Sequence, residues 1–222
     1  MKKIITIFIA LMSAFIISCG QKTTDTPADT VSNTNDTSAH SGHAAHTAGS
    51  EIIDLMHAPM MEQAFQKTAN IDADFLFNMI PHHKGAILSS KKLLETTKNE
   101  KLIELANNII MSQEQEVAEF TQLVDELNQK GTVYEDVDTV ALGDEMEDIM
   151  NKMMEDMAAI EVTGDNDIDF LKGMIPHHQA AVDVSKKILE YTKDEKIKEI
   201  ANRIILAQEK EIADMNNMLN SL

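Results

Sequence analysis

Apolar side chains recur at spacings of three and four residues over most of the chain beyond residue 70. The recurrence runs through residues 75–94 and again through 102–120, and such spacing predicts long amphipathic helices. Polar triplets at 97–99 and 192–194 interrupt the pattern and predict tight breaks between successive helices. Helices of about 25 to 30 residues would be roughly 40 Å long, which is typical of an up-and-down bundle.

This helical pattern occurs twice. Residues 72–118 align with residues 167–213 at a constant offset of 95 without a gap, and 28 of the 47 positions are identical. Duplication accounts for this agreement. Each copy predicts a hairpin of two helices, so the chain is expected to be all-α, with a four-helix bundle made from two duplicated hairpins. The repeats are predicted at about 52–130 and 144–222.

Two shorter segments that precede the hairpins are rich in methionine. Residues 51–69 come before the first hairpin, and residues 144–160 come before the second. Both segments predict extra short helices. Methionine fills irregular cores, and this role stands against a metal-binding role for the group Met56, Met60, Met61, Met146, Met150, Met153, Met154 and Met157.

Prolines interrupt the same position of both copies. Pro81 and Pro176 lie within the predicted helices, where a proline removes a backbone hydrogen bond at a cost of about 3 kcal/mol. A kink there would redirect the histidines that follow. The alternative is that each proline lies in the first turn of a helix that begins later.

The N-terminal segment has the pattern of a bacterial export signal. Two lysines precede an almost unbroken apolar run at 4–17, which is too short for a comfortable transmembrane helix. The segment from Ile16 to Cys19 resembles a lipobox, in which cleavage precedes a cysteine that becomes acylated. We therefore predict a lipoprotein signal peptide at 1–18 and a lipid anchor on Cys19, in the bacterial cell envelope and facing the periplasm. An uncleaved anchor or an incidental cysteine is the alternative.

The segment at 19–50 has almost no large apolar residue, and this composition predicts a disordered tether. Within it, His40, His43 and His46 are spaced three residues apart. Such a run can chelate a divalent metal weakly and flexibly. It is equally consistent with polar filler in a linker.

Composition excludes several function classes. The chain has 19 Lys and Arg against 37 Asp and Glu, a formal net charge of −18, which repels nucleic-acid phosphates. We therefore predict no nucleic-acid partner. A single cysteine among 222 residues cannot form an internal disulfide.

The candidate chemistry lies in a motif that both copies contain, a methionine followed three and four residues later by two adjacent histidines. Side chains at these spacings share a helical face, whereas adjacent histidines point about 100° apart, so one histidine of each pair is expected to face the core. Thioether and imidazole together suit copper, especially Cu(I). We predict a metal site formed by Met79, His82, His83, Met174, His177 and His178; structural hydrogen bonding is the alternative role of the histidines.

The duplicated Met-Ile-Pro-His-His segment, followed in each copy by an alanine and then by Gln-Glu-x-Glu ending at Glu116 and Glu211, resembles the domain of unknown function 305 family. The resemblance covers roughly residues 70–220. It implies an exported bacterial protein of a ferritin-like four-helix class, in which some members are associated with copper. This chain has Ser89 and Val184 where many relatives carry a methionine.

Together these features predict a lipid-anchored metal-binding protein of the cell envelope that buffers, sequesters or delivers copper as Cu(I). Its predicted partners are the membrane, through the anchor, the metal ion and a metal-exchange protein. An envelope structural or adaptor bundle without metal is the alternative. A ferritin-like redox enzyme is a weaker one, because a di-iron site needs Glu-x-x-His and no Glu of this chain is followed by His three residues later; we expect no enzymatic activity.

Overall fold

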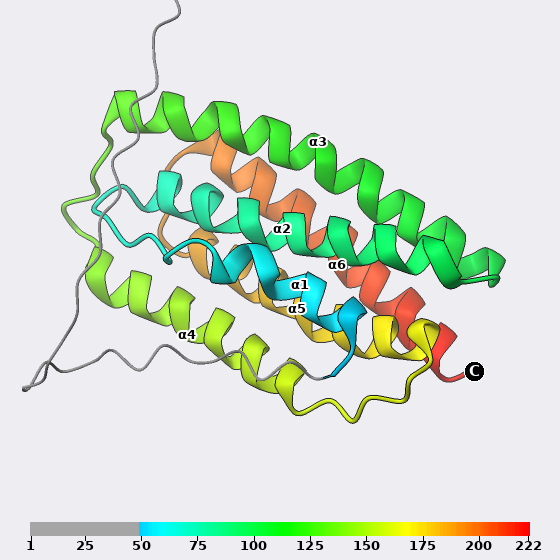
Figure 1. The fold of residues 1–222 in the computed structure, drawn as a ribbon. Coiled ribbons are helices and arrows are strands. Elements are labelled where there is room, and N and C mark those ends of the chain that lie inside the picture. Colours follow the sequence, from blue (N-terminus) through cyan, green and yellow to red (C-terminus); the bar gives the residue numbers. More distant parts are fainter. Residues whose placement is uncertain (1–48) are drawn as a thin grey trace, which may run out of the picture. The chain divides into compact units, whose positions relative to one another are not determined.

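The computed structural model describes residues 49–222, which fold into six α-helices and contain no strand (Figure 1). The predicted all-α class is therefore confirmed. The predicted signal peptide, Cys19 and the three tether histidines lie outside the described residues. The helices are α1 (Glu51–Met61), α2 (Ile71–Thr96), α3 (Glu100–Lys130), α4 (Thr139–Ala158), α5 (Asn166–Leu189) and α6 (Glu195–Leu219).

The breaks between helices lie where the polar triplets predict them. The side chains of Asn99 and Asp194 accept hydrogen bonds from backbone N–H groups in the first turns of α3 and α6. These side chains satisfy donors that a helix start leaves unpaired. Gly131 ends α3 in the left-handed conformation at a φ of 61°, which glycine adopts at little cost.

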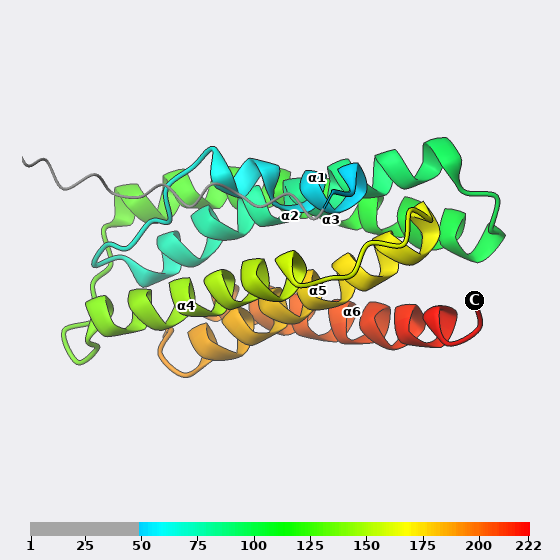
Figure 2. The same ribbon diagram turned by 60° about the horizontal axis from the view of Figure 1, so that its bottom comes forward.

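Two hairpins form the body of this helical unit. Helix α2 packs along α3, α5 packs along α6, and α2 and α5 also contact each other, so the two hairpins meet through their first helices. Helix α1 lies against both α2 and α5, whereas α4 runs beside α5 (Figures 1 and 2). None of the helices in the described part is long and apolar enough to cross a membrane.

Both duplicated prolines lie in helix interiors. Pro81 is well inside α2, which begins at Ile71, and Pro176 is well inside α5. The alternative that each proline opens a helix is therefore wrong. Each proline removes one backbone hydrogen bond from its helix, which nevertheless continues beyond it to Thr96 or Leu189.

The duplicated Asp-x-Asp at the helix starts has a structural role. Asp74 accepts hydrogen bonds from the backbone N–H and the hydroxyl of Thr68, and Asp169 accepts the same two bonds from Thr163. Each aspartate thus ties the preceding loop to the first turn of its helix. This pairing fixes where α2 and α5 begin, and with them the position of the histidines.

Candidate metal centre

The first histidines of the two pairs meet at the centre of the fold. The rings of His82 on α2 and His177 on α5 are stacked, with centroids 3.7 Å apart and an interplanar angle of 28°. Both side chains are fully buried, and neither ring nitrogen of either histidine has a hydrogen-bond partner. Burial, together with the neighbouring imidazoles, holds the pKa of both histidines well below 6.5. The centre is therefore a pair of neutral imidazoles.

The second histidines point outward to a carboxylate in each half. His83 Nε2 donates to Glu116 at 2.9 Å, and His178 Nε2 donates to Glu211 at 2.8 Å. An ionised carboxylate can only accept, so Nε2 carries the proton and Nδ1 of a neutral imidazole keeps its lone pair. Nδ1 of both histidines is buried without a partner. A carboxylate on the far nitrogen is the usual way in which proteins orient a metal-ligating histidine.

One histidine of each pair, His82 and His177, faces the opposite hairpin at the core, and the second histidine is fully buried as well. The reason is that α2 lies between α3 and α5, and α5 lies between α6 and α2. The 100° between adjacent side chains turns one histidine toward the facing hairpin and the other toward the second helix of its own hairpin. Both directions are covered.

The other predicted donors are also inside. Met79 and Met174 are fully buried, one turn before the histidines on α2 and α5. Within residues 49–222, no group of three or more His, Cys, Asp or Glu side chains is placed to hold a metal ion. The centre thus contains six unpartnered imidazole nitrogens, of which a neutral His82 and a neutral His177 can each offer one lone pair, with thioethers on the same helices.

Sequence reasoning left Glu116 and Glu211 out of the site. Both glutamates lie 33 residues after the histidine that they contact, and both belong to the repeat. The signal was present, since Gln-Glu-x-Glu is duplicated, but a glutamate on an amphipathic helix is ordinarily solvent-facing. His57 on α1 was also missed. It is buried, and desolvation lowers its pKa despite the opposing charge of Asp54.

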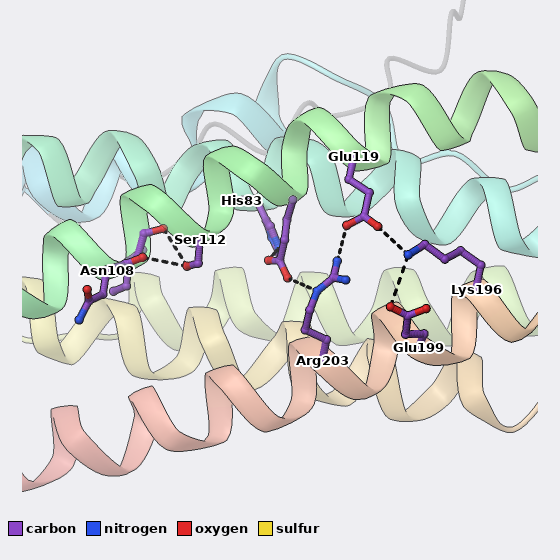
Figure 3. Close-up of polar contacts among 9 residues, drawn as sticks. His83, Asn108, Ser112, Glu119, Lys196, Glu199 and Arg203 are labelled. Atoms are coloured by element: carbon purple, nitrogen blue, oxygen red, sulfur yellow. Dashed lines mark hydrogen bonds and ion pairs between the residues drawn. The ribbon is translucent and has the colours of Figure 1, made fainter.

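The two glutamates differ in their surroundings. Arg203 on α6 donates from Nε to Glu116 at 3.2 Å and also pairs with Glu119 (Figure 3). Burial alone would raise the pKa of Glu116, but the hydrogen bonds from His83 and Arg203 outweigh it and bring this pKa below 4.5. In the other half, the position equivalent to Arg203 is occupied by Asn108, so Glu211 lacks this guanidinium.

The comparisons with known proteins agree with these features. Residues 9–124 and 72–219 match a family described as "Domain of unknown function (DUF305)", and the chain belongs to this family. An uncharacterized protein of Acanthamoeba polyphaga mimivirus is 47% identical over 55 residues, which cover 25% of this chain and 36% of that protein. The chain thus matches only about a third of that relative's length.

Solved structures with the same fold include three of a protein named CopM. The Ag-bound form, obtained by soaking, is 27% identical to this chain, with a TM-score of 0.52 over 68% of this chain and 95% of CopM. The Cu(II)-bound form is 24% identical with the same TM-score, over 68% and 96%. A DUF305 fragment from Deinococcus radiodurans is 22% identical, with a TM-score of 0.52 over 70% of this chain and 99% of the fragment. The latter two show the fold alone.

Proposed function

We propose that this protein binds copper as Cu(I) at the buried histidines and carries it as cargo. The observation that supports this most directly is the pair of carboxylate-bound histidines, His83 and His178, each with Nδ1 buried and unpartnered. A buried nitrogen without a partner is costly unless a ligand uses it. The likeness to the silver-bound form of CopM, which is 27% identical, supports the choice of a soft metal.

The donor set favours a soft ion. Structural zinc sites take four ligands from Cys, His and carboxylates, and no group of even three such side chains is assembled in the described part of the chain. Hard cations prefer oxygen ligands, whereas the centre offers imidazole nitrogens and the thioethers of Met79 and Met174. Cu(I) accepts low coordination numbers and thioether donors. The neutral state of His82 and His177 leaves their lone pairs free at neutral pH.

The wider setting of this function is also part of the proposal. A signal peptide at 1–18 and an acylated Cys19 would hold the protein at the periplasmic side of an envelope membrane, since two or more acyl chains give stable anchoring. There it would buffer, sequester or deliver copper through a metal-exchange protein. The two repeats would form a ferritin-like four-helix bundle, with α1 and α4 as the additional helices.

A metal-free adaptor is the second candidate. It is favoured by the stacking of His82 on His177 at 3.7 Å, because an aromatic contact of this kind contributes to packing by itself. In that case the histidines would stabilise the junction of the two hairpins. Metal titration separates the two functions.

The test uses the full chain with Cys19→Ser and with Ala at His40, His43 and His46, which removes the thiol and the tether imidazoles. Cu(I) affinity is measured anaerobically in competition with a coloured chelator, and Zn(II) is titrated in parallel. We expect tight binding of Cu(I) that falls about 100-fold or more in His83→Gln/His178→Gln, with helicity retained by circular dichroism. If the unsubstituted histidine centre binds no Cu(I), the adaptor function replaces this proposal.

The carboxylates provide a matched control. Glu116→Gln/Glu211→Gln should weaken Cu(I) binding by about 10- to 100-fold, because the carboxylates orient the imidazoles and raise their basicity. Glu114→Gln/Glu209→Gln changes two exposed glutamates that pair with lysines on the other helix of their own hairpins and should leave affinity unchanged. Equal losses in both double variants would indicate a general charge effect.

The anchor is tested separately. Cys19→Ser should move the protein from the membrane fraction to the soluble fraction or block its maturation, because the acidic chain has little affinity for an anionic surface. Unchanged membrane fractionation and electrophoretic mobility would contradict the lipid anchor.

A further inference from the structure

The route by which a metal ion reaches the buried histidines differs between the two halves. At the Glu116 side, Arg203 bonds the carboxylate that contacts His83, and Glu119 holds the same guanidinium (Figure 3). At the Glu211 side, a pocket of about 310 Å³ opens between α3 and α6. Its charged and polar lining comprises Lys101, Glu104, Asn108, Lys210, Glu211 and Asp214.

Glu211 is the element that joins this pocket to the centre. It lines the pocket, its side chain is only 15% exposed, and it contacts the fully buried His178, whose Nδ1 has no partner. Lys210, the nearest cation in sequence, is bound by Asp214 at 2.6 Å. Over residues 49–222, no lysine or arginine forms an ion pair with Glu211, so an incoming cation displaces neither, although Lys101 and Lys210 line the same pocket.

We propose that the metal ion enters and leaves through the α3–α6 pocket at Glu211, and that Arg203 closes the equivalent route at Glu116. This inference rests on the proposed copper binding. To admit an ion, Glu211 gives up one hydrogen bond, from His178. Glu116 would have to give up the bonds from both His83 and Arg203, and the guanidinium repels an approaching cation.

From Glu211 the ion passes to His178, whose Nε2 faces the carboxylate and whose buried Nδ1 has no hydrogen-bond partner. The ring of His177 lies next, with its centroid 6.1 Å from that of His178, and stacks on His82. Glu211 acts as a positioning residue at the entrance, whereas its counterpart Glu116 orients His83 while bound to Arg203.

The duplicated sequence supplies the test. Arg203 pairs with Glu116 and Glu119, and the equivalent residues of the other half are Asn108, Glu211 and Asp214. Asn108→Arg therefore places a guanidinium beside Glu211 and Asp214. The full chain with Cys19→Ser and with Ala at His40, His43 and His46 is loaded with Cu(I), and transfer of the ion to a coloured chelator is followed by stopped flow. We expect Asn108→Arg to slow transfer at least about ten-fold, with equilibrium affinity unchanged. The control Asn107→Arg adds the same charge at an adjacent exposed residue outside this pocket and should transfer at the original rate.

Arg203→Asn opens the second route and does not depend on how well the new arginine is accommodated. It should speed transfer about two-fold or more, and Asn108→Arg/Arg203→Asn should restore transfer by exchanging the two sides. Unchanged transfer in Arg203→Asn, or in a folded Asn108→Arg with unchanged affinity, overturns the inference and leaves copper binding intact. A protein that binds no Cu(I) overturns the proposed function instead, and this inference with it.

Discussion

The two hairpins are equivalent at the centre and different at the periphery. Each contributes a buried histidine to the central stack and a second histidine that donates to a glutamate of its own second helix. The coverings differ, because α1 has 11 residues and contacts both α2 and α5, whereas α4 has 20 residues and packs beside α5. The halves thus retain the same residues where they meet each other and diverge where their neighbours differ.

Because of this difference, the two halves offer the same donor residues but surround the carboxylates differently. The shared centre fixes which donors are available, and the divergent surfaces, such as Arg203 against Asn108, fix whether a guanidinium is bound to the carboxylate. Duplication alone would give two equal sites. The structure instead gives one buried centre with two unequal sides.

The largest expected effect lies at the point where α1 crosses α2. A Cβ on Gly85 would lie 1.7 Å from the backbone oxygen of Met56, so Gly85→Ala has to displace α1. We expect a loss of at least about 3 kcal/mol in the free energy of unfolding. The equivalent residue in the other half is Ala180, and Ala180→Gly should cost only about 1 kcal/mol. Denaturant titration of both variants measures the contrast, and equal losses would mean that the coverings are not the source of the asymmetry.

The second effect concerns the shared centre and depends on pH. Because the folded state lowers the pKa of His82 and His177, the unfolded chain binds more protons below pH 6.5, and stability falls as the pH falls through that value. Each histidine should remove about 1.4 kcal/mol by one pH unit below 6.5. Metal-free unfolding measured from pH 7.5 to 5.5 checks this. His82→Gln and His177→Gln should each remove the same share of the slope, with His57, whose pKa is also lowered, contributing to the remainder, whereas unequal shares would break the equivalence of the centre.

Much of the fold could be predicted from the sequence, but the surroundings of Glu116 and Glu211 could not. Helical periodicity and the polar triplets located α2, α3, α5 and α6, because each of these helices has a buried face in a regular pattern. The histidines were identified because the Met-x-x-His-His motif is duplicated. The pairing of His83 with Glu116 depends on how α3 packs on α2, and the arginine at Glu116 comes from another hairpin. A linear pattern contains no information on such contacts between helices.

The third effect tests a pair of hydrogen bonds to a buried aspartate that only the first half has. Asp72 is buried and accepts hydrogen bonds from Tyr134 and Thr192, each at 2.6 Å, whereas its counterpart Asp167 is partly exposed. Burial raises the pKa of Asp72 in spite of these bonds. We expect Tyr134→Phe to lower the unfolding free energy by about 1 to 2 kcal/mol, because it removes a donor from a buried carboxyl group. Asp167→Asn, the control, should change stability by less than about 0.5 kcal/mol, and a similar loss in both variants would remove the distinction.

The smallest effect should be the same in both halves. Lys91 pairs with Glu114 at 2.7 Å, and the equivalent Lys186 pairs with Glu209 at 2.8 Å, with all four side chains about half exposed. Solvent screens such pairs, so each coupling energy from a double-mutant cycle should be below about 0.5 kcal/mol and should shrink further in 1 M salt. Because both pairs bridge the two helices of a hairpin in the same register, their couplings should agree within error. A clear difference between them would show that the asymmetry of the coverings extends into the hairpins themselves.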